Sequence, residues 1–197
     1  MFEYITKFES QLAEFFGAPY AVATDCCTHA IELCLRYEQY DNIEIPEHTY
    51  ISIPFTAEKL GLKWKWKKNY IWCDYYYIWN TNIIDAAVLW ERDSYIPGTY
   101  MCLSFQFKKH LNLGRGGLIL LDNKDAYDRI KKMVYDGRSS DKPWSEQNID
   151  SIGYHYYMTP ETAILGLKKF EEVCDKQPKK WQYLDYPFLP NMEVFKK

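Results

Sequence analysis

The chain has 197 residues, of which 47% are hydrophobic and 18% aromatic, so its apolar surface is large enough to exclude a disordered chain. Its 24 basic and 27 acidic residues give a net charge of −3, which excludes long-range attraction of nucleic acid or an anionic membrane. The six cysteines lack zinc-ribbon spacing, and no apolar stretch approaches the ~18 residues of a membrane span. We therefore expect a cytoplasmic protein with reduced thiols, no metal site, and small molecules or proteins as partners.

Apolar runs typical of strands alternate with helical patterns along most of the chain. The expected strands lie over 20–23, 43–45, 62–66, 83–84, 100–105 and 118–121, and the expected helices over 2–16, from 28, over 51–60, over 123–135 and from 159. The aromatic run 70–79 has no readable period, although 70–73 fits a short strand, and 137–158 is expected to be exposed. This order predicts an α/β fold with a mainly parallel sheet flanked by helices, in a domain over 1–176 with a C-terminal arm over 177–197.

Polar residues follow several of these strands, and ligands of open α/β sheets bind at the carboxyl ends of strands. The turn Asp25-Cys26-Cys27-Thr28 precedes a helix whose free N–H groups suit a phosphate, unless Thr28 is only the helix cap. Asp85 follows an apolar run, where a carboxylate needs a positive partner or a proton, unless it lies in a surface turn.

A lysine pair follows the buried strand that starts at Tyr100. If either lysine of the pair Lys108-Lys109 is desolvated there, its pKa is lowered and it can act as an amine nucleophile toward a carbonyl. The alternative is that Lys108 and Lys109 are both solvated surface residues. The aromatic loop 153–157 contains one imidazole, His155, and its composition indicates only that the loop packs on another surface.

In this order the segments resemble the DegT/StrS family of pyridoxal-phosphate-dependent sugar aminotransferases, which have the aspartate-aminotransferase fold. The most specific match is Ser104-Phe105, Lys109 and Gly114-x-Gly116-Gly117, which is similar to the family's Ser-Phe…Lys…Gly-x-Gly-Gly pattern. The other matching segments are the opening helix 8–17 with strand 20–23, the phosphate turn 26–28 (Ser-Gly-Thr in the family), the Pro-x-x-Thr-aromatic stretch 46–50, the Asp-Ala-Ala segment 85–87, and the Gly-Tyr-Asn-Tyr-x-Met-Thr loop at 153–159.

The resemblance implies a role for each matched residue. Lys109 would carry pyridoxal phosphate as a Schiff base and shuttle the proton, and Asp85 would hold the pyridine nitrogen protonated. The remaining predicted cofactor-binding residues are Cys27, Thr28 and Ser104 at the phosphate, Tyr50 against the pyridine ring, and His155 at the phosphate of the neighbouring subunit in a homodimer.

The function that the resemblance implies is transfer of an amino group from an amino acid such as glutamate to a keto sugar that is attached to a nucleotide. Two alternatives remain open. In the family's dehydratases a histidine replaces the lysine, and His110 is adjacent to Lys109. The chain is also compatible with a non-catalytic remnant that binds the cofactor, a nucleotide sugar or a protein partner, because Val88 replaces a usual glutamine, Cys27 replaces a glycine, and we expect most of the C-terminal small domain to be missing.

Overall fold

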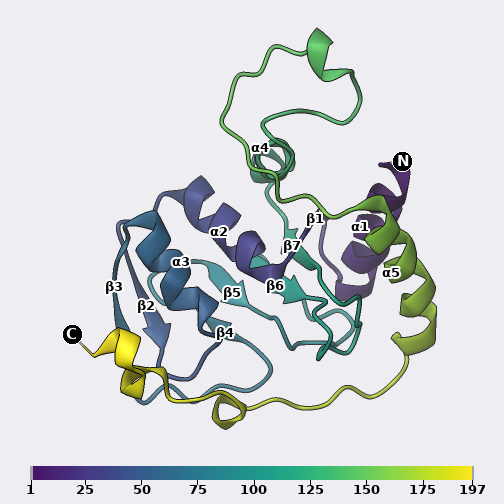
Figure 1. The fold of residues 1–197 in the computed structure, drawn as a ribbon. Helices are drawn as coiled ribbons and strands as arrows, with labels where there is room; N and C mark the ends of the chain where they lie inside the picture. Colours follow the sequence, from purple (N-terminus) through teal and green to yellow (C-terminus); the bar gives the residue numbers. More distant parts are fainter. Residues whose placement is uncertain (1, 197) are drawn as a thin grey trace.

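The computed structural model describes residues 2–196, and its main feature is a five-stranded sheet (Figure 1). In spatial order the strands are β1 (Tyr20–Thr24), β7 (Gly117–Leu121), β6 (Tyr100–Ser104), β5 (Ile83–Asp85) and β4 (Tyr76–Tyr77). β5 and β6 are parallel, whereas β7 is antiparallel to both β1 and β6, and β4 is antiparallel to β5. The sheet is therefore mixed, and the prediction of a mainly parallel sheet was wrong.

The connections explain the strand directions. β4 and β5 are joined by the short turn 78–82, and the connection from β6 to β7 contains no helix. Parallel neighbours need a longer crossover, usually through a helix, so these connections give antiparallel pairs. The expected strand at 70–73 is also wrong, because the strand of the aromatic run is β4.

A separate two-stranded parallel sheet contains β2 (Asn42–Pro46) and β3 (Lys63–Lys67). The helix α3 (Ser52–Leu60) connects them, so the predicted strand–helix–strand unit is confirmed. Gly61 ends α3 in the left-handed conformation, with φ of 66°. That conformation suits glycine and was the reason for predicting the end of the helix at this position.

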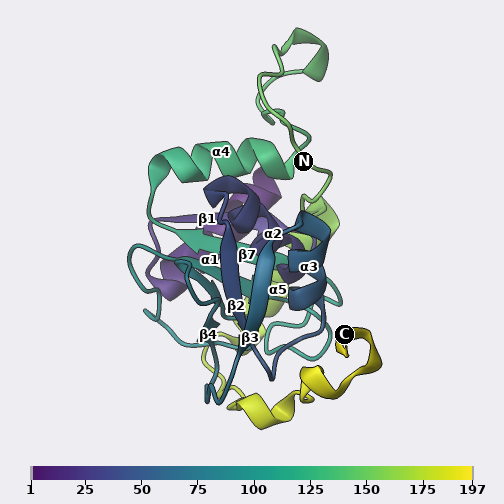
Figure 2. The ribbon, with the colours of Figure 1, turned by 90° about the vertical axis from the view of Figure 1, so that its left-hand side faces the viewer.

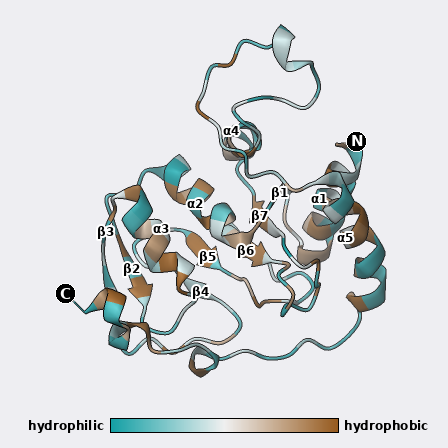
Figure 3. Ribbon diagram, in the orientation of Figure 1, coloured by the Kyte–Doolittle hydropathy of each residue, from teal (hydrophilic) through white to brown (hydrophobic). Residues whose placement is uncertain are grey.

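Helices cover both faces of the main sheet (Figures 1 and 2). The helices α1 (Glu3–Phe16) and α5 (Pro160–Val173) pack on one face, and α2 (Cys27–Glu38) and α4 (Lys124–Val134) pack on the other. Side chains of a strand point alternately to the two faces, so Leu118 and Leu120 join the first cluster while Ile119 joins the second. Figure 3 shows the result, with mostly hydrophobic strands inside and helices of mixed hydropathy outside.

Two segments lie outside this layered core. Residues 138–150 project from the end of α4 and include a 3₁₀ turn at Trp144–Glu146 (Figure 1). The expectation of an exposed segment over 137–158 holds for this part only, because the tyrosines of 154–157 pack on the core and Met158 is buried. After α5 the chain turns back and runs past β4 toward β2 and β3 (Figure 1). Within the described residues, no helix combines the length and the apolar character that a membrane span needs.

Candidate functional site

The carboxyl ends of β1, β5 and β6 lie at one edge of the main sheet. Gly117 pairs with Thr24 on one side and with Ser104 on the other, and Asp85 pairs with Cys102 on β6. The turn into α2, the end of β5 and the loop that carries Lys109 therefore meet at this edge. This is where ligands bind in open α/β sheets.

Gly117 allows the turn into α2 to lie directly on β7. A Cβ atom at this position would be 2.4 Å from the carbonyl carbon of Cys26 and 2.5 Å from the backbone nitrogen of Cys27. Any larger residue would therefore push the turn away from the sheet. In the present arrangement Cys27 is buried and its thiol donates a hydrogen bond to the Cys102 carbonyl oxygen at 3.5 Å.

Asp85 forms the floor of the site and is only 6% exposed. Its Oδ1 atom accepts a hydrogen bond from the Ala87 N–H at 3.0 Å, and the Tyr76 hydroxyl donates to Oδ2. The Tyr76 hydroxyl also contacts the Thr49 hydroxyl. Burial raises the pKa of Asp85, although the Tyr76 and Ala87 hydrogen bonds and the Lys109 charge partly oppose this change. Uncharged groups thus hold the carboxyl group in place.

Lys109 lies close enough to Asp85 for the two charges to act on each other. Burial lowers the pKa of Lys109, and the nearby Asp85 and Cys27 only partly oppose that effect. Among the described residues, no carboxylate forms an ion pair with Lys109, and its Nζ lies 5.4 Å from the centre of the Trp181 ring. Lys108, in contrast, is exposed, so the alternative of two solvated lysines does not hold for Lys109.

His110 lines the same small cavity as Lys109, but its imidazole is engaged by other groups. Its Nε2 lies 3.0 Å from the carbonyl oxygen of Val173 at the end of α5, and its ring centre is 5.3 Å from that of Trp90. The imidazole is therefore engaged with the α5 side of the fold. The charge of Asp85 acts on Lys109, whereas the His110 imidazole is hydrogen-bonded to the end of α5, and this arrangement favours Lys109 over the dehydratase alternative.

Of the predicted phosphate and ring contacts, Ser104 lines the same cavity as Lys109. Ser104 is half-buried at the end of β6, where its hydroxyl accepts a hydrogen bond from the Gln106 N–H at 3.4 Å. The Thr28 hydroxyl lies 2.8 Å from that of Ser52, and this contact joins the first turns of α2 and α3. Tyr50 lies just before α3 and is 55% exposed, so its ring is open to solvent.

His155 is not brought to the pocket of its own chain. Its side chain is 70% exposed, and Nδ1 lies 3.1 Å from Oδ2 of Asp136. The neighbouring Tyr156 points the other way and stacks on His29 of α2, with ring centres 3.6 Å apart. The loop therefore packs on α2 through its tyrosines and leaves the imidazole outside. Its predicted contact with a partner subunit stays a prediction.

The turn before α2 carries a cluster of charged groups. Asp25 Oδ1 lies 2.6 Å from Nδ1 of His29, and the Arg115 guanidinium donates to Asp25 Oδ2 at 2.7 Å. Burial alone would lower the pKa of His29, but hydrogen bonds with Asp25 and Cys26 raise it to about 9. Ligand atoms of Asp25, Cys26 and His29 lie within 4.8 Å of one another. With a protonated His29 and Arg115 beside it, this cluster suits an anion better than a metal ion.

Two residues near the C-terminus, Trp181 and Tyr186, lie near the pocket. No periodic pattern in the sequence predicted their position. The Trp181 ring approaches Lys109, and both line a cavity of about 120 Å³ together with Ser104 and Val88. Tyr186 lies close enough to Asp85 and Cys27 for their charges to act on it. Burial, followed by those two groups, raises the pKa of Tyr186.

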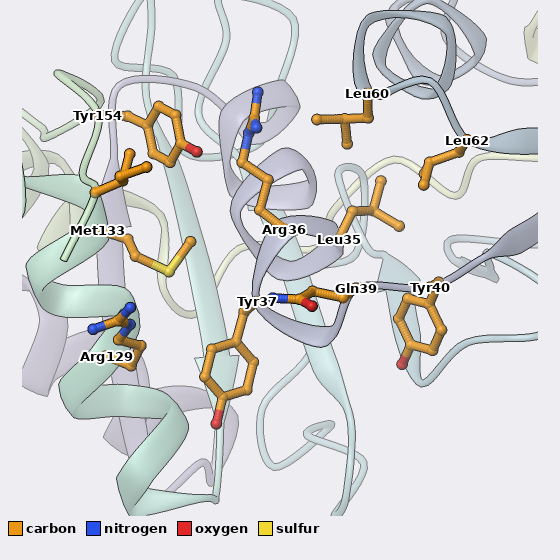
Figure 4. A pocket seen from close by; sticks show the side chains of 11 residues that line it. Leu35, Arg36, Tyr37, Gln39, Tyr40, Leu60, Leu62, Arg129, Met133 and Tyr154 are labelled. Atoms are coloured by element: carbon orange, nitrogen blue, oxygen red, sulfur yellow. The ribbon is translucent and has the colours of Figure 1, made fainter.

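A larger surface cleft lies elsewhere, at the C-terminal end of α2 (Figure 4). Its volume is about 530 Å³, and its wall includes Arg36, Arg129 and Tyr154. None of the site residues predicted from the sequence lines it. This cleft is separate from the phosphate turn, which lies at the opposite end of α2.

Comparison with solved structures shows the same fold in proteins of low sequence identity. CalS13, a sugar aminotransferase from Micromonospora echinospora, gives a TM-score of 0.72 at 14% identity. The pyridoxal-phosphate form of Spr1654, from Streptococcus pneumoniae, gives 0.71 at 16% identity, and GDP-4-keto-6-deoxymannose-3-dehydratase with bound GDP-perosamine gives 0.66 at 15%.

These matches cover 86%, 86% and 87% of this chain but only 60%, 59% and 61% of the solved proteins. The chain therefore spans less than two thirds of their length. No curated protein sequence is significantly similar to it.

A family model gives the direct assignment. The model of the DegT/DnrJ/EryC1/StrS aminotransferases matches residues 1–64 and 97–189, and these ranges contain the phosphate turn and Lys109. Asp85 lies in the unmatched segment between them, yet the fold places it next to Lys109. The chain belongs to the DegT/DnrJ/EryC1/StrS aminotransferase family.

Proposed function

We propose that this chain binds pyridoxal phosphate covalently through Lys109 and transfers an amino group from an amino acid such as glutamate to a nucleotide-linked keto sugar. The observation that carries the proposal is the burial of the Lys109 amine next to the Asp85 carboxyl group. The cofactor-bound form of the pneumococcal relative supports the choice of cofactor.

The side chains present fit this cofactor. A buried carboxyl group with neutral partners suits a protonated pyridine nitrogen, and Asp85 can accept one more hydrogen bond than the two described above. An amine with a lowered pKa is more often unprotonated, which is the form that reacts with an aldehyde. When bound, pyridoxal phosphate supplies an electron sink for negative charge on the substrate carbon.

The residues of the chain would then divide the remaining work. Lys109 would move the proton between the substrate and cofactor carbons. The N-terminal turn of α2, with Thr28 and the cationic His29, would hold the phosphate. Cys27 replaces a glycine of the family, but φ at this position is not positive, so the replacement does not strain the turn.

Reduction with borohydride in the presence of pyridoxal phosphate tests the attachment. Peptide mapping by mass spectrometry should place the adduct on Lys109 in the parent and in a Lys108→Ala variant. The Lys109→Ala variant should carry none. An adduct on Lys108, or no adduct at saturating cofactor, would contradict the proposal.

A non-catalytic binding role is the second candidate, and one observation favours it. Val88, which stands where the family has a glutamine, places an apolar side chain in the wall of the Lys109 cavity. This role predicts that the adduct forms but that no amino group passes from glutamate to a nucleotide-linked keto sugar. Single-turnover release of 2-oxoglutarate from the loaded protein distinguishes the two candidates.

We also propose a homodimer in which His155 completes the phosphate site of the partner subunit. The exposed imidazole, held outward by the packing of Tyr156 on α2, supports this arrangement. Mixing Lys109→Ala chains with His155→Ala chains should restore one intact site per mixed dimer. Recovery of no binding beyond that of the separate variants, with subunit exchange verified independently, would contradict the shared site.

A further inference from the structure

The segment 178–191, here called the C-terminal strap, crosses the Lys109–Asp85 pocket. It leaves the end of α5 and runs along the lower edge of the molecule past β4 (Figures 1 and 2). Its Trp181 ring stands 5.4 Å from Nζ of Lys109, and its Tyr186 is influenced by the charges of Asp85 and Cys27. The Trp181 ring thus lies over Lys109, and the Tyr186 ring packs on Trp72, which contacts Tyr76, the hydrogen-bond partner of Asp85.

One end of the strap is fastened to Asp74. The Asp74 N–H donates to the Trp181 carbonyl oxygen at 2.9 Å, and the Trp181 N–H donates to Asp74 Oδ1 at 2.9 Å. Lys180 adds an ion pair to Asp74 Oδ2 at 3.0 Å. Next along the strap, the Tyr183 N–H donates to the Trp72 carbonyl oxygen at 3.1 Å. These contacts fix the Trp181 ring over the pocket.

The other end is fastened near β2. Nδ1 of His48 lies 2.8 Å from the Tyr186 carbonyl oxygen, and the Leu189 N–H donates to the Glu47 carbonyl oxygen at 2.9 Å. Leu189 is fully buried, whereas Leu184 in the middle of the strap is 66% exposed. Between these ends Tyr183 and Tyr186 pack on the second core cluster, but Leu189 is the only buried residue of the strap, all of whose residues the structure describes. Such segments open at a low free-energy cost.

We infer that the C-terminal strap is an autoinhibitory cover that must move away before a ligand reaches Lys109 and Asp85. The inference rests on the proposed function, because it concerns access to the proposed cofactor site. A ligand that binds only the open form has its apparent affinity reduced by the fraction of molecules that are open. The strap therefore regulates how much pyridoxal phosphate the chain takes up at a given concentration.

A disulfide that can be formed and reduced again, here called the lock, tests this inference. Cys73 is exposed and pairs with Gln182 of the strap in an antiparallel bridge, so a Gln182→Cys variant places two thiols at a spacing that a disulfide can span. Oxidation should close the strap, and reduction should free it. A variant with both Gln182→Cys and Cys73→Ser cannot form this bond and serves as the matched control.

The first readout needs no cofactor. Reductive methylation with formaldehyde and a borane reductant, followed by mass spectrometry, should label Lys109 about tenfold more slowly in the oxidised lock than in the reduced one, because labelling requires the open form. The exposed Lys108 of the same molecule should be labelled equally in both states. Equal labelling of Lys109 in both states, or failure of the disulfide to form on oxidation, would overturn the inference.

The second readout uses pyridoxal phosphate as the probe. Its uptake should fall in the oxidised lock and should rise in a Leu189→Ala variant, with Trp144→Ala as a control in the exposed segment 138–150. If the disulfide slows the labelling of Lys109 but neither the oxidised nor the reduced protein takes up the cofactor, the proposed function is wrong and the inferred cover is supported. If the oxidised protein, the reduced protein and the Leu189→Ala variant take up the cofactor equally and the labelling of Lys109 does not change, the inferred cover is wrong and the proposed function is supported.

Discussion

Two buried carboxyl groups of this fold have opposite surroundings. Glu32 on α2 is 1% exposed, and its carboxylate contacts the Arg36 guanidinium at 2.8 Å and the Lys59 amine at 2.9 Å. Burial would raise the pKa of Glu32, but these two cations lower it below its ordinary value. Asp85 has only the Tyr76 hydroxyl and a backbone N–H as direct partners, and burial leaves its pKa raised.

The difference separates a charge that stabilises the fold from one that is available to a ligand. Glu32 is fully paired within the chain, so it has no capacity left for a cationic ligand. Asp85 keeps a carboxyl group without an ion pair among the described residues in a desolvated place, where the charge of Lys109 still acts on it. Groups with pKa values shifted by burial in this way are typical of functional sites.

The largest expected effect is the loss of activity on changing Asp85→Asn. A neutral amide no longer favours a protonated pyridine nitrogen, so transamination should fall by about 10²–10³-fold, as when one preorganised electrostatic partner is removed. Covalent capture of the cofactor by Lys109 should remain. Activity and borohydride-fixed cofactor should be measured on the same preparation. An Asp85→Asn protein as active as the parent would mean that Asp85 is not the ring partner.

Stability should respond in the opposite order. Glu32→Gln removes two charge-assisted contacts and should lower the free energy of unfolding by about 1–3 kcal/mol. Asp85→Asn replaces a carboxyl group that is costly to ionise in the folded state, so it should leave stability unchanged or slightly increased. Urea unfolding of both variants and the parent makes the comparison. A larger loss for Asp85→Asn than for Glu32→Gln would contradict our reading of the two sites.

The two carboxyl groups should also differ in the pH dependence of stability. The pKa of Glu32 is lowered from 4.5 on folding, so its stabilisation is present above that value and is lost as the pH falls through the folded pKa. The stability difference between the parent and Glu32→Gln should therefore be full above pH 4.5 and should shrink as the pH falls below that value through the folded pKa. A difference that stays constant over this fall in pH would show that the Glu32 charge is not its source.

The smallest expected effect concerns His29 at the phosphate turn. Its pKa is raised on folding from 6.5 to about 9, so the contribution of its charged form is present below 6.5 and is lost as the pH rises through about 9. The parent should lose stability over this window relative to His29→Gln. Titration of the imidazole by NMR offers a direct measurement, and a midpoint near 6.5 would contradict the proposed charge cluster.

Local sequence patterns predicted most of the elements and placed Asp85 and Lys109 after strands, whereas their joint role at one cofactor was implied by the family resemblance. Both residues follow apolar runs, and the order of strands and helices brings such positions to one sheet edge. Strand direction could not be predicted in this way, because a run of buried residues has the same hydrophobic pattern whether its strand is parallel or antiparallel to the neighbouring strand. The direction of β7 depends on how the chain returns to the sheet after β6, and the spacing of apolar side chains carries no information on that connection.

The partners of the site were harder to predict than its charged residues. Tyr76 lies in the run 70–79, where aromatic residues at nearly every position hide any alternation. Trp181 and Tyr186 lie in a segment without periodicity, and they reach the pocket through contacts such as that of Tyr186 with His48. Those contacts depend on the tertiary fold alone.

The order of the strap in the chain has a consequence for folding during synthesis. Its fastening points Glu47, His48 and Asp74 all precede it, and the contacts join residues as far apart as 107 and 138 positions in sequence. Contacts of such long range form late, and the N-terminal part of a chain folds first as it leaves the ribosome. Asp85 and Lys109 are therefore synthesised before the strap, and we expect the contacts of the strap to form after the pocket residues have folded.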